Sequence, residues 1–551
     1  MRCRDMIFNL FIPNHAVLFH HPTIINTQGM NIISFRTTAL VPLCFSIGII
    51  AVVNLLFSPA HVMFQRLFIF TLLMLSFPLI KLRSRRMLVA ALPVMVVAWD
   101  VMISLYARET SNSAFSYGFA MSVLDSTPSE MMAMLRLYIH YAMGFIGLAA
   151  LLLSAVWFTP GLPGNRWPRL PLYCLVLMLL INIGQAVAHS IRKNSHGSIS
   201  ARVINYTPVS NLKYFVQAWN DKRLIAGISG TVPDYPFHTW DTGIDTYVVV
   251  VGESARAENM HFYGYPKDTT PELDSQRLQL LSWDHAISPA PVTITAVPLA
   301  LSADTVSDHN LKNYPDNIIN LANRAGYDTS WFSKQGVVGD YNNAITGIAI
   351  NAREKKWLQS KYDDTLLPEL KQALSRGGKQ LIVLHLYGNH EPECQRFPPQ
   401  ETRFTEREGG IDACYDNSIR YTDKLLGQMF TLLEGRRASL IYFSDHALER
   451  DPQKRVVYYH GGAKPSQHAY QVPMFIWYSK QVTKPETGSV KELYSTANNF
   501  QIIRYWLGIG LQNESLPGTI KERAVQLSGE VLVLDTTNTV YDWRQLSSLK
   551  E

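Results

Sequence analysis

The sequence predicts a chain of two parts, an N-terminal membrane domain of five helices and a C-terminal α/β domain with a mostly parallel sheet. Three observations support this prediction. The chain has 551 residues, which is more than one domain usually holds. Apolar residues are concentrated in the first 190 residues, in five long segments. After these segments, runs typical of buried strands alternate with amphipathic helices.

The five apolar segments have about the length that crosses a bilayer. A buried core helix is the alternative for any one of them, but five in succession with short connections favour a membrane domain. The second is the weakest, because a basic residue lies near its start. The five segments are residues 38–57, 64–80, 87–106, 135–158 and 170–187.

Basic loops predict the orientation of this domain. The loop KLRSRR (81–86) carries four basic residues, and the loop TPGLPGNRWPR (159–169) carries two arginines and no acid. Such loops stay in the cytoplasm, so the loop 107–133 and the chain after residue 190 lie on the outer side. Residues 1–37 are then cytoplasmic. They lack the pattern of a signal peptide, and Met30 is a second candidate for the first residue.

Charge and cysteine content narrow the function and the compartment. The net charge is only +6 and no long basic run is present, which argues against nucleic-acid binding. Of the five cysteines, only Cys394 and Cys414 follow the apolar segments. We expect these two to form a disulfide on the outer side of the membrane, where it would add about 3 kcal/mol of stability.

The soluble part divides into a polar connector (191–242) and an α/β domain (243–551). Apolar runs bounded by polar residues are typical of buried parallel strands. They occur at TYVVVV (246–251), QLIVLHL (380–386) and SLIYFSD (439–445), and helical patterns lie between them. The membrane domain accordingly covers residues 38–190.

Each buried run ends in polar side chains. Open α/β sheets bind ligands beyond the carboxyl ends of their strands, so these side chains should converge. For one histidine alone, a structural hydrogen bond is the simpler interpretation. For the whole set, the residue types favour a transition-metal site for zinc or manganese. The set comprises Glu253, His385, His390, Asp445, His446 and, 14 residues further on, His460.

The stretch SPAPVTITAVP (288–298) holds two threonines, Thr293 and Thr295. Threonine favours strands, and spacing by two residues places both on one face of a strand. A half-buried strand edge is therefore one interpretation. The other is a nucleophile, because a metal ion activates a hydroxyl that is unreactive at its ordinary pKa.

Longer strings resemble a known family, the bacterial inner-membrane phosphoethanolamine transferases of the alkaline phosphatase/sulfatase superfamily. The most specific string is VVVVGESARAENMHFYGYPKDTTPELD (248–274). Others are LIVLHLYGNHEP (381–392), YFSDHALERD (442–451) and YYHGG (458–462). The resemblance covers nearly the whole chain and is greatest to less characterised enterobacterial members, described as hydrolases or transferases. It implies five spans and a periplasmic catalytic domain of alkaline phosphatase/sulfatase type.

The resemblance also implies roles for single residues. The family nucleophile precedes the proline of a T-x-x-x-V-P string by five residues, which selects Thr293. One zinc ion would be held by Glu253, Thr293, Asp445 and His446. Phosphate or a second zinc would be held by His390 and His460, and His385 ranks below them. Zn²⁺, one ion or two, is therefore expected, with Mn²⁺ as the alternative.

The family binds the lipid head group through three residues spaced by four, which here match Ser122, Ser126 and Glu130. A helix N-cap and first turn is the alternative for this stretch. Two features depart from the family pattern. Pro289 and Leu299 replace cysteines that flank the nucleophile loop in many members, so packing must hold this loop. Ala447 replaces a glycine, and positive φ there would strain the backbone.

The function that the resemblance implies is metal-dependent transfer of phosphoethanolamine. Phosphatidylethanolamine would be the donor, lipopolysaccharide or a periplasmic glycan the acceptor, and phosphothreonine the intermediate, in a monomeric multi-pass protein of the bacterial inner membrane. A phosphoglycerol transferase or a phosphodiesterase on the same scaffold is the alternative. A sulfatase is disfavoured, because position 293 holds neither Cys nor Ser. An inactive membrane partner is disfavoured by the complete ligand set.

Overall fold

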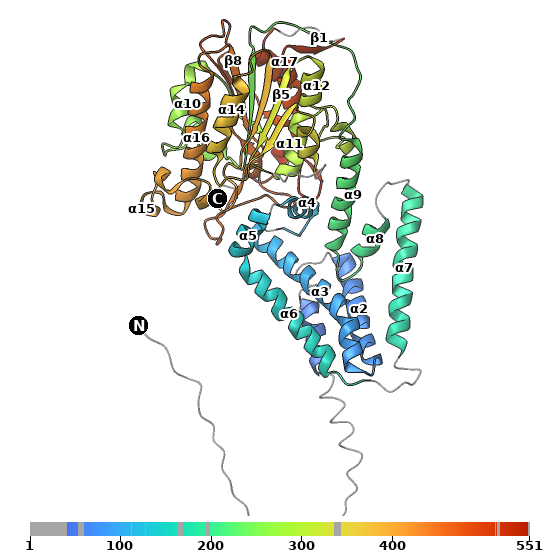
Figure 1. Cartoon of the computed structure of the whole chain (residues 1–551). Helices are drawn as coiled ribbons and strands as arrows, with labels where there is room; N and C mark the ends of the chain where they lie inside the picture. The colour runs from blue at the N-terminus through green and yellow to red at the C-terminus, as the bar shows by residue number, and fades with distance from the viewer. Residues whose placement is uncertain are drawn as a thin grey trace, which may run out of the picture.

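A computed structural model of the chain places a layered α/β domain beside an N-terminal group of helices (Figure 1). The segment 1–37 and Met30 lie outside the described residues, so the predictions on them stay predictions. The structure describes residues 41–52, 60–111, 113–126, 128–161, 169–193, 199–335, 343–512, 514 and 518–548.

The N-terminal helices correct the predicted number of membrane spans. Among the described residues, three helices are long and apolar enough to cross a membrane: Arg83–Thr110, Ile139–Phe158 and Leu170–Ala188. The first two predicted segments fall on the shorter apolar helices Val41–Val52 and Met63–Leu79. Five predicted spans thus become three candidates, because apolar composition alone does not show how long each helix runs.

Two of these spans belong to slightly longer helices, and the span Ile139–Phe158 is the whole of α6. The named elements of this part are α2 (Ala60–Ser76), α3 (Arg83–Ser111), α4 (Tyr117–Asp125), α5 (Pro128–Leu137), α6 (Ile139–Phe158) and α7 (Leu170–Lys193). The predicted segment 135–158 is interrupted at Tyr138, which separates α5 from α6. Apolar side chains on these helices remain exposed in the protein alone, as expected for a surface that faces lipid.

The centre of the α/β domain is an eight-stranded sheet. Its central strand β2 pairs in parallel with β7 and β8, as the apolar runs predicted, while β12 is antiparallel to both its neighbours. The strand order is β13 (Gly488–Val490), β3 (Leu280–Trp283), β12 (Met474–Tyr478), β8 (Ala438–Ser444), β2 (Thr246–Gly252), β7 (Gln380–His385), β5 (Asp328–Ser333) and β6 (Glu354–Trp357).

Helices cover both faces of this sheet (Figure 1). Alternate residues of β2 therefore enter opposite cores: Val249 packs with one helix layer and Val250 with the other. This double burial explains why the strand is continuously apolar. One layer contains α10 (Pro271–Ser275), α14 (Leu366–Leu374) and α16 (Ala413–Leu433); the other contains α11 (Thr293–Leu301), α12 (Ile318–Arg324), α13 (Ala344–Ala349) and α17 (Asn499–Trp506).

The connector is built into the structure. It forms α8 (Ile199–Asn205), α9 (Leu212–Ile228) and β1 (Phe237–Thr239), and β1 pairs with β15 (Ile509–Leu511). The remaining elements are β4 (Ala286–Ile287), β9 (Glu449–Arg450), β10 (Tyr458–Tyr459), β11 (Gln471–Val472), β14 (Tyr494–Ser495), α15 (Glu406–Gly409), α18 (Ile520–Gln526), β16 (Leu532–Leu534) and β17 (Val540–Asp542).

Helix α4 docks onto the α/β domain. The Gly118 amide donates to the Thr536 carbonyl at 2.9 Å. A Cβ on Gly118 would lie 3.2 Å from the Thr536 side chain, so only glycine allows this close approach without a shift. Lys222 on α9 also donates to Asp125 at 2.6 Å. The helices that precede the sheet therefore form one wall of the region beside its carboxyl edge.

Candidate active site

The carboxyl ends of β2 and β8 bring three predicted site residues together. Gly252 pairs with Ser444 at the ends of these strands, so Glu253 follows one strand beside Asp445 and His446 on the other. The Asp445 amide donates to the Gly252 carbonyl at 3.0 Å. The polar ends predicted from the two apolar runs thus meet at one edge of the sheet.

Thr293 is the first residue of helix α11, not part of a strand, so the strand interpretation of this stretch is wrong. The Thr293 hydroxyl donates to Glu253 Oε2 at 2.9 Å and lies 3.2 Å from His446 Nε2. Thr295 is 5% exposed and makes no side-chain contact with this group among the described residues. The helix forms because its apolar residues all face buried layers, which overrides the strand preference of threonine.

Packing holds the loop that precedes Thr293, as the missing cysteines required. Leu299 is fully buried in a small apolar cluster with Ala290 and Leu534. The Leu534 amide donates to the Pro289 carbonyl at 2.8 Å. The C-terminal strand β16 therefore supports the loop that precedes Thr293 in the place of a disulfide.

Three ionisable side chains are buried side by side at the edge of the sheet. His446 Nε2 lies 3.4 Å from Glu253 Oε1 and 3.5 Å from Asp445 Oδ2. Burial raises the pKa of Asp445 to about 8, and the Glu253 carboxylate acts in the same direction. Burial opposes ionisation of Glu253 as well, but attraction to His446 lowers its pKa well below the usual value. His446 has its pKa raised to about 9, because the two carboxylates outweigh its burial.

This arrangement fits a divalent cation. Asp445 Oδ2 is buried and has no hydrogen-bond partner among the described residues. Two carboxylates that repel each other in a buried site are stabilised by a positive ion, which displaces their protons. His446 Nδ1 donates to the Ala447 carbonyl at 2.8 Å, which leaves Nε2 as the atom able to bind a metal.

His460 lies closer to the metal-type residues than the sequence indicated. One ligand atom each of Glu253, His446 and His460 lies within 4.8 Å of the others. His390 is the next side chain outward, with its ring 5.6 Å from that of His460. His390 Nδ1 donates to the Glu391 carbonyl at 2.7 Å and thereby leaves Nε2 available.

Ala447 does not have the positive φ that would strain its backbone. Among the described residues other than glycine, only Ser254, Lys464 and Asn538 have positive φ. Ala447 instead donates its amide to the Ala469 carbonyl at 3.1 Å and fits a fully buried position. The residue with positive φ in the site is Ser254, at 55°, and its amide donates to Asp445.

Sequence reasoning missed two polar residues beside the site. Gln335 follows strand β5 and donates to Glu253 Oε2 at 2.8 Å and to the Leu386 carbonyl at 2.7 Å. Glu391 Oε2 accepts from the Tyr138 hydroxyl at 3.1 Å, and its Oε1 lies 3.8 Å from His460 Nδ1. Strand β5 contains polar residues and gave no continuous apolar run, so the polar residue after it carried no signal.

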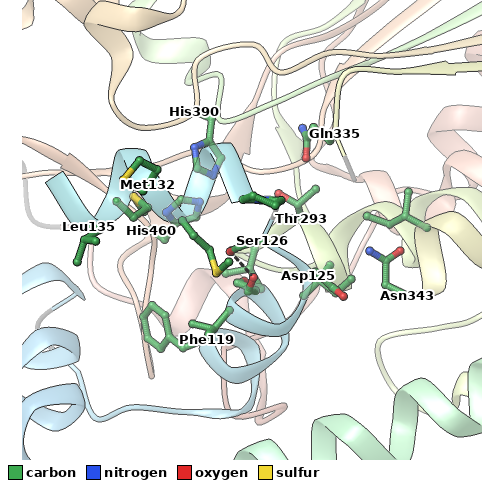
Figure 2. Close-up of a pocket in the computed structure, with 18 of the residues that line it drawn as sticks. Phe119, Asp125, Ser126, Met132, Leu135, Thr293, Gln335, Asn343, His390 and His460 are labelled. Carbon is green, nitrogen blue, oxygen red and sulfur yellow. Dashed lines mark hydrogen bonds between the residues drawn. The ribbon is translucent and has the colours of Figure 1, made fainter. Parts of the chain in front are cut away.

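A cavity of about 820 Å³ opens beside Thr293. Figure 2 shows His390, His460 and Thr293 around it, with Met132 and Leu135 of α5 beside His460 and Phe119 of α4 below. The cavity therefore combines a polar end at the sheet with an apolar end contributed by α4 and α5.

Two of the three residues matched to head-group binding line this cavity. Ser122 and Ser126 line it, but their hydroxyls donate to the carbonyls of Gly118 and Ser122, at 3.0 and 2.8 Å. Ser126 is the C-cap of α4 and not an N-cap, whereas Glu130 lies in the first turn of α5, as the helix-start alternative expects. The side chain of Glu130 lies outside the described part of the chain.

The remaining predicted residues occupy defined positions. Cys394 and Cys414 form a disulfide with Cα atoms 4.7 Å apart, joining the loop after His390 to helix α16. His385 ends β7, is 1% exposed and lines the cavity. It stands apart from the metal-type group, and its Nδ1 lies 3.1 Å from Ser333 Oγ.

Comparisons with known proteins cover both parts of the chain. A family model described as Sulfatase matches residues 245–509, and one described as the transferase YhbX N-terminal domain matches residues 30–229. The YhbX protein of Escherichia coli O157:H7, named as a transferase, is 42% identical over 511 residues, which cover 92% of this chain and 94% of the relative. Phosphoethanolamine transferase OpgE of Escherichia coli K12 is 32% identical over 268 residues, covering 46% and 50%.

Two solved structures share the fold. The integral membrane lipooligosaccharide phosphoethanolamine transferase A (EptA) of Neisseria meningitidis has a TM-score of 0.60 at 18% identity and covers 86% of this chain and 93% of its own. The periplasmic domain of EptC from Escherichia coli, in complex with zinc, has a TM-score of 0.51 at 22% identity and covers 58% and 98%. The chain therefore belongs to the phosphoethanolamine transferase family of sulfatase-type proteins, and it is a transferase.

Proposed function

We propose that this protein transfers phosphoethanolamine from phosphatidylethanolamine to a glycolipid or glycan of the bacterial envelope. The intermediate is a phosphothreonine at Thr293. The observation that carries the proposal is the hydroxyl of Thr293, which contacts a buried carboxylate and a buried imidazole and lines a cavity of about 820 Å³. Relatives named phosphoethanolamine transferases support the group that is transferred.

The site residues fit zinc. Glu253, Asp445 and His446 would hold one ion together with Thr293, and their carboxylate and imidazole donors suit Zn²⁺. A bound zinc ion would supply positive charge that favours the alkoxide form of Thr293. The zinc complex of an EptC domain with the same fold supports this choice of metal. His460 and His390 would then hold phosphoryl oxygens or a second ion.

Two displacements account for the transfer. Thr293 Oγ1 attacks the phosphorus of the donor, a bond forms between them, and the bond from phosphorus to the diacylglycerol oxygen breaks. The Thr293 proton leaves to a neighbouring base, and the diacylglycerol oxygen gains a proton. An acceptor hydroxyl then attacks the phosphothreonine, restores Thr293 and loses its own proton. The N-terminus of α11 directs its positive end toward the phosphoryl group in both steps.

The cavity supports a lipid donor. Its wall on the N-terminal helices includes Met131, Met132 and Leu135, each at least 45% exposed in the protein alone. The acyl chains of phosphatidylethanolamine can lie against these side chains while its phosphate reaches Thr293. We therefore propose that residues 38–190 form the inner-membrane domain, that residues 191–242 connect it to a periplasmic catalytic domain at 243–551, and that one chain forms a complete site.

The test is mass spectrometry of the purified full chain after incubation with phosphatidylethanolamine vesicles. We expect a phosphoethanolamine group on the Thr293 peptide, absent in Thr293→Ala and present in the control Thr295→Val. Vesicles of phosphatidylglycerol serve as the second arm. Phosphoglycerol on Thr293 would instead support the alternative donor. Modification elsewhere, or equal modification of Thr293→Ala, would contradict the role of Thr293.

A further inference from the structure

The cavity has a second polar region, on the side of strands β5, β6 and β7. Trp331 and His385 line it there, and both side chains are buried, at 0% and 1% exposure. Trp331 Nε1 and His385 Nε2 each lack a hydrogen-bond partner among the described residues. Their rings are 6.1 Å apart and meet edge to face. Two unsatisfied buried polar atoms on one cavity wall indicate a ligand that satisfies them.

Hydrogen bonds define which atom of His385 carries the proton. Ser333 Oγ donates to the Gln335 carbonyl at 2.7 Å, so its only proton is already used. It must therefore accept from His385 Nδ1, 3.1 Å away. His385 Nε2 is then a bare acceptor, while Trp331 Nε1–H is a donor. Burial also lowers the pKa of His385 to about 4, which keeps the ring neutral near pH 7.

One donor beside one acceptor matches a hydroxyl group, which both donates and accepts. A phosphate is bound by several donors or by positive charge, and this wall offers few donors and no charge: no charged side chain lines the cavity from strands β5, β6 and β7 or from helix α13 within the described residues. The half-buried ring of Trp357 and the amide of Asn343 line the same wall. Aromatic faces with uncharged polar groups suit a sugar ring.

We propose that the wall formed by Trp331, His385 and Trp357 is the acceptor subsite, and that it takes a neutral sugar through a hydroxyl group. This inference rests on the proposed function and adds the class of acceptor: a sugar hydroxyl rather than a sugar phosphate. The donor lipid occupies the wall formed by α4 and α5, and Thr293 lines the same cavity.

The subsite is connected to the nucleophile through hydrogen bonds. Thr293 donates to Glu253 Oε2, which also accepts from Gln335 Nε2, and Gln335 bonds Ser333 through its backbone. Ser333 accepts from His385. A sugar hydroxyl bound at this wall attacks the phosphothreonine phosphorus. The new oxygen–phosphorus bond replaces the Thr293 Oγ1–phosphorus bond, and the hydroxyl proton passes to Thr293 Oγ1 or to a neighbouring base.

Direct binding is the first test, and it does not require activity. Saturation-transfer NMR on the detergent-solubilised full chain uses methyl β-D-glucopyranoside as the probe and inorganic phosphate as the competitor. We expect the wild type to bind the glucoside and Trp331→Phe to bind it at least about tenfold more weakly, since a hydrogen bond is lost. The matched control is Trp283→Phe, because Trp283 is equally buried, has an unpartnered Nε1 and does not line the cavity.

A conservative pair separates binding from packing at His385. Gln in place of His385 keeps an acceptor near the Nε2 position, whereas Asn keeps only a group near Nδ1. We expect His385→Gln to retain most glucoside binding and His385→Asn to lose it. Equal binding by Trp331→Phe and Trp283→Phe, no glucoside signal from the wild type, or full competition by phosphate would each overturn the subsite.

The two half-reactions distinguish this inference from the proposed function. Loading of Thr293 from phosphatidylethanolamine vesicles tests the function, and transfer from loaded protein to the glucoside tests the subsite. We expect Trp331→Phe to load Thr293 and to transfer at least about tenfold more slowly than Trp283→Phe. A wild type that never loads contradicts the function alone. A Trp331→Phe variant that loads and transfers like the control contradicts the subsite alone.

Discussion

The two carboxylate oxygens of Asp445 differ in their hydrogen bonds, and this difference bears on metal binding. Its Oδ1 accepts from the amides of Ser254 and His446, at 3.1 and 2.7 Å, and is well satisfied. Its Oδ2 is buried and has no hydrogen-bond partner among the described residues, although His446 Nε2 lies 3.5 Å away. The hydrogen bonds to Oδ1 fix the carboxylate, and we propose that Oδ2 is the oxygen that binds a metal ion.

We expect the substitution Asp445→Asn to stabilise the folded protein when zinc is absent and to weaken zinc binding. The amide keeps the Oδ1 acceptor and removes the charge. Because burial raises the pKa of Asp445 to about 8, the folded protein binds an extra proton, and without zinc the wild type loses stability as the pH rises from about 4 to about 8. We therefore expect the zinc-free variant to be more stable than the wild type at pH 8, by on the order of 1 kcal/mol.

Zinc binding should fall at least about 100-fold in the same variant, because a charged ligand is lost. Thermal unfolding at several pH values, with chelator and with added zinc, measures both effects. Equal destabilisation by Asp445→Asn in the two conditions would show that Asp445 has only a packing role.

At the scale of elements, one carboxylate ties together the end of the α/β domain. Glu514 receives charged hydrogen bonds from Arg504 of α17 and from Arg523 of α18, and it also accepts from the Leu511 amide of β15 at 3.1 Å. These hydrogen bonds, with that of Arg504 as the largest cause, lower the pKa of Glu514 to about 2. Arg504 is 2% exposed, so it depends on this partner.

We expect Glu514→Gln to destabilise the protein by about 2 kcal/mol at pH 7. The pKa of Glu514 is lower in the folded protein than in the unfolded chain, where it is near 4.5. Ionised Glu514 therefore stabilises the folded protein at pH values above about 4.5, and this contribution disappears as the pH falls from about 4.5 to about 2. The difference between variant and wild type should therefore vanish toward pH 2. Thermal unfolding measures it, with Glu522→Gln as a control that lacks an ion pair among the described residues. A difference independent of pH would contradict this account.

For the whole molecule, contacts between the N-terminal helices and the α/β domain reach the candidate site. The Tyr138 hydroxyl, at the start of α6, donates to Glu391, whose other oxygen faces His460. Tyr138 and Glu391 are 9% and 4% exposed, so water does not replace this contact easily. Glu391 therefore links the start of α6 to His460, a side chain of the candidate metal group.

We expect Tyr138→Phe to slow loading of Thr293 about tenfold, because Glu391 loses a buried donor and no longer orients His460. The matched control is Tyr141→Phe, since Tyr141 also lines the cavity but bonds Glu109 of the N-terminal helices. Loading is measured with phosphatidylethanolamine vesicles, and bound zinc is measured in parallel. Equal loading rates for both variants would rule out a role for the Tyr138–Glu391 contact.

Some features of the fold and of the candidate site could be predicted from local sequence patterns alone. Continuous apolar runs identified β2, β7 and β8, because burial on both faces leaves no polar position in such strands. Glu253, Asp445 and His446 followed from the strand ends, since parallel strands end at one edge. Strand β5 escaped notice because its polar residues hide the pattern, and with it Gln335 and Trp331 were missed.

The sequence by itself determined the two-part architecture, the residues at the strand ends and, through one family string, the choice of Thr293 over Thr295. Periodicity and spacing are local properties that a chain carries before it folds. Only the tertiary structure decided that Thr293 begins a helix, that His460 joins Glu253 and His446, and that Tyr138 contacts Glu391. These outcomes depend on which distant segments pack together, and no local pattern encodes that choice.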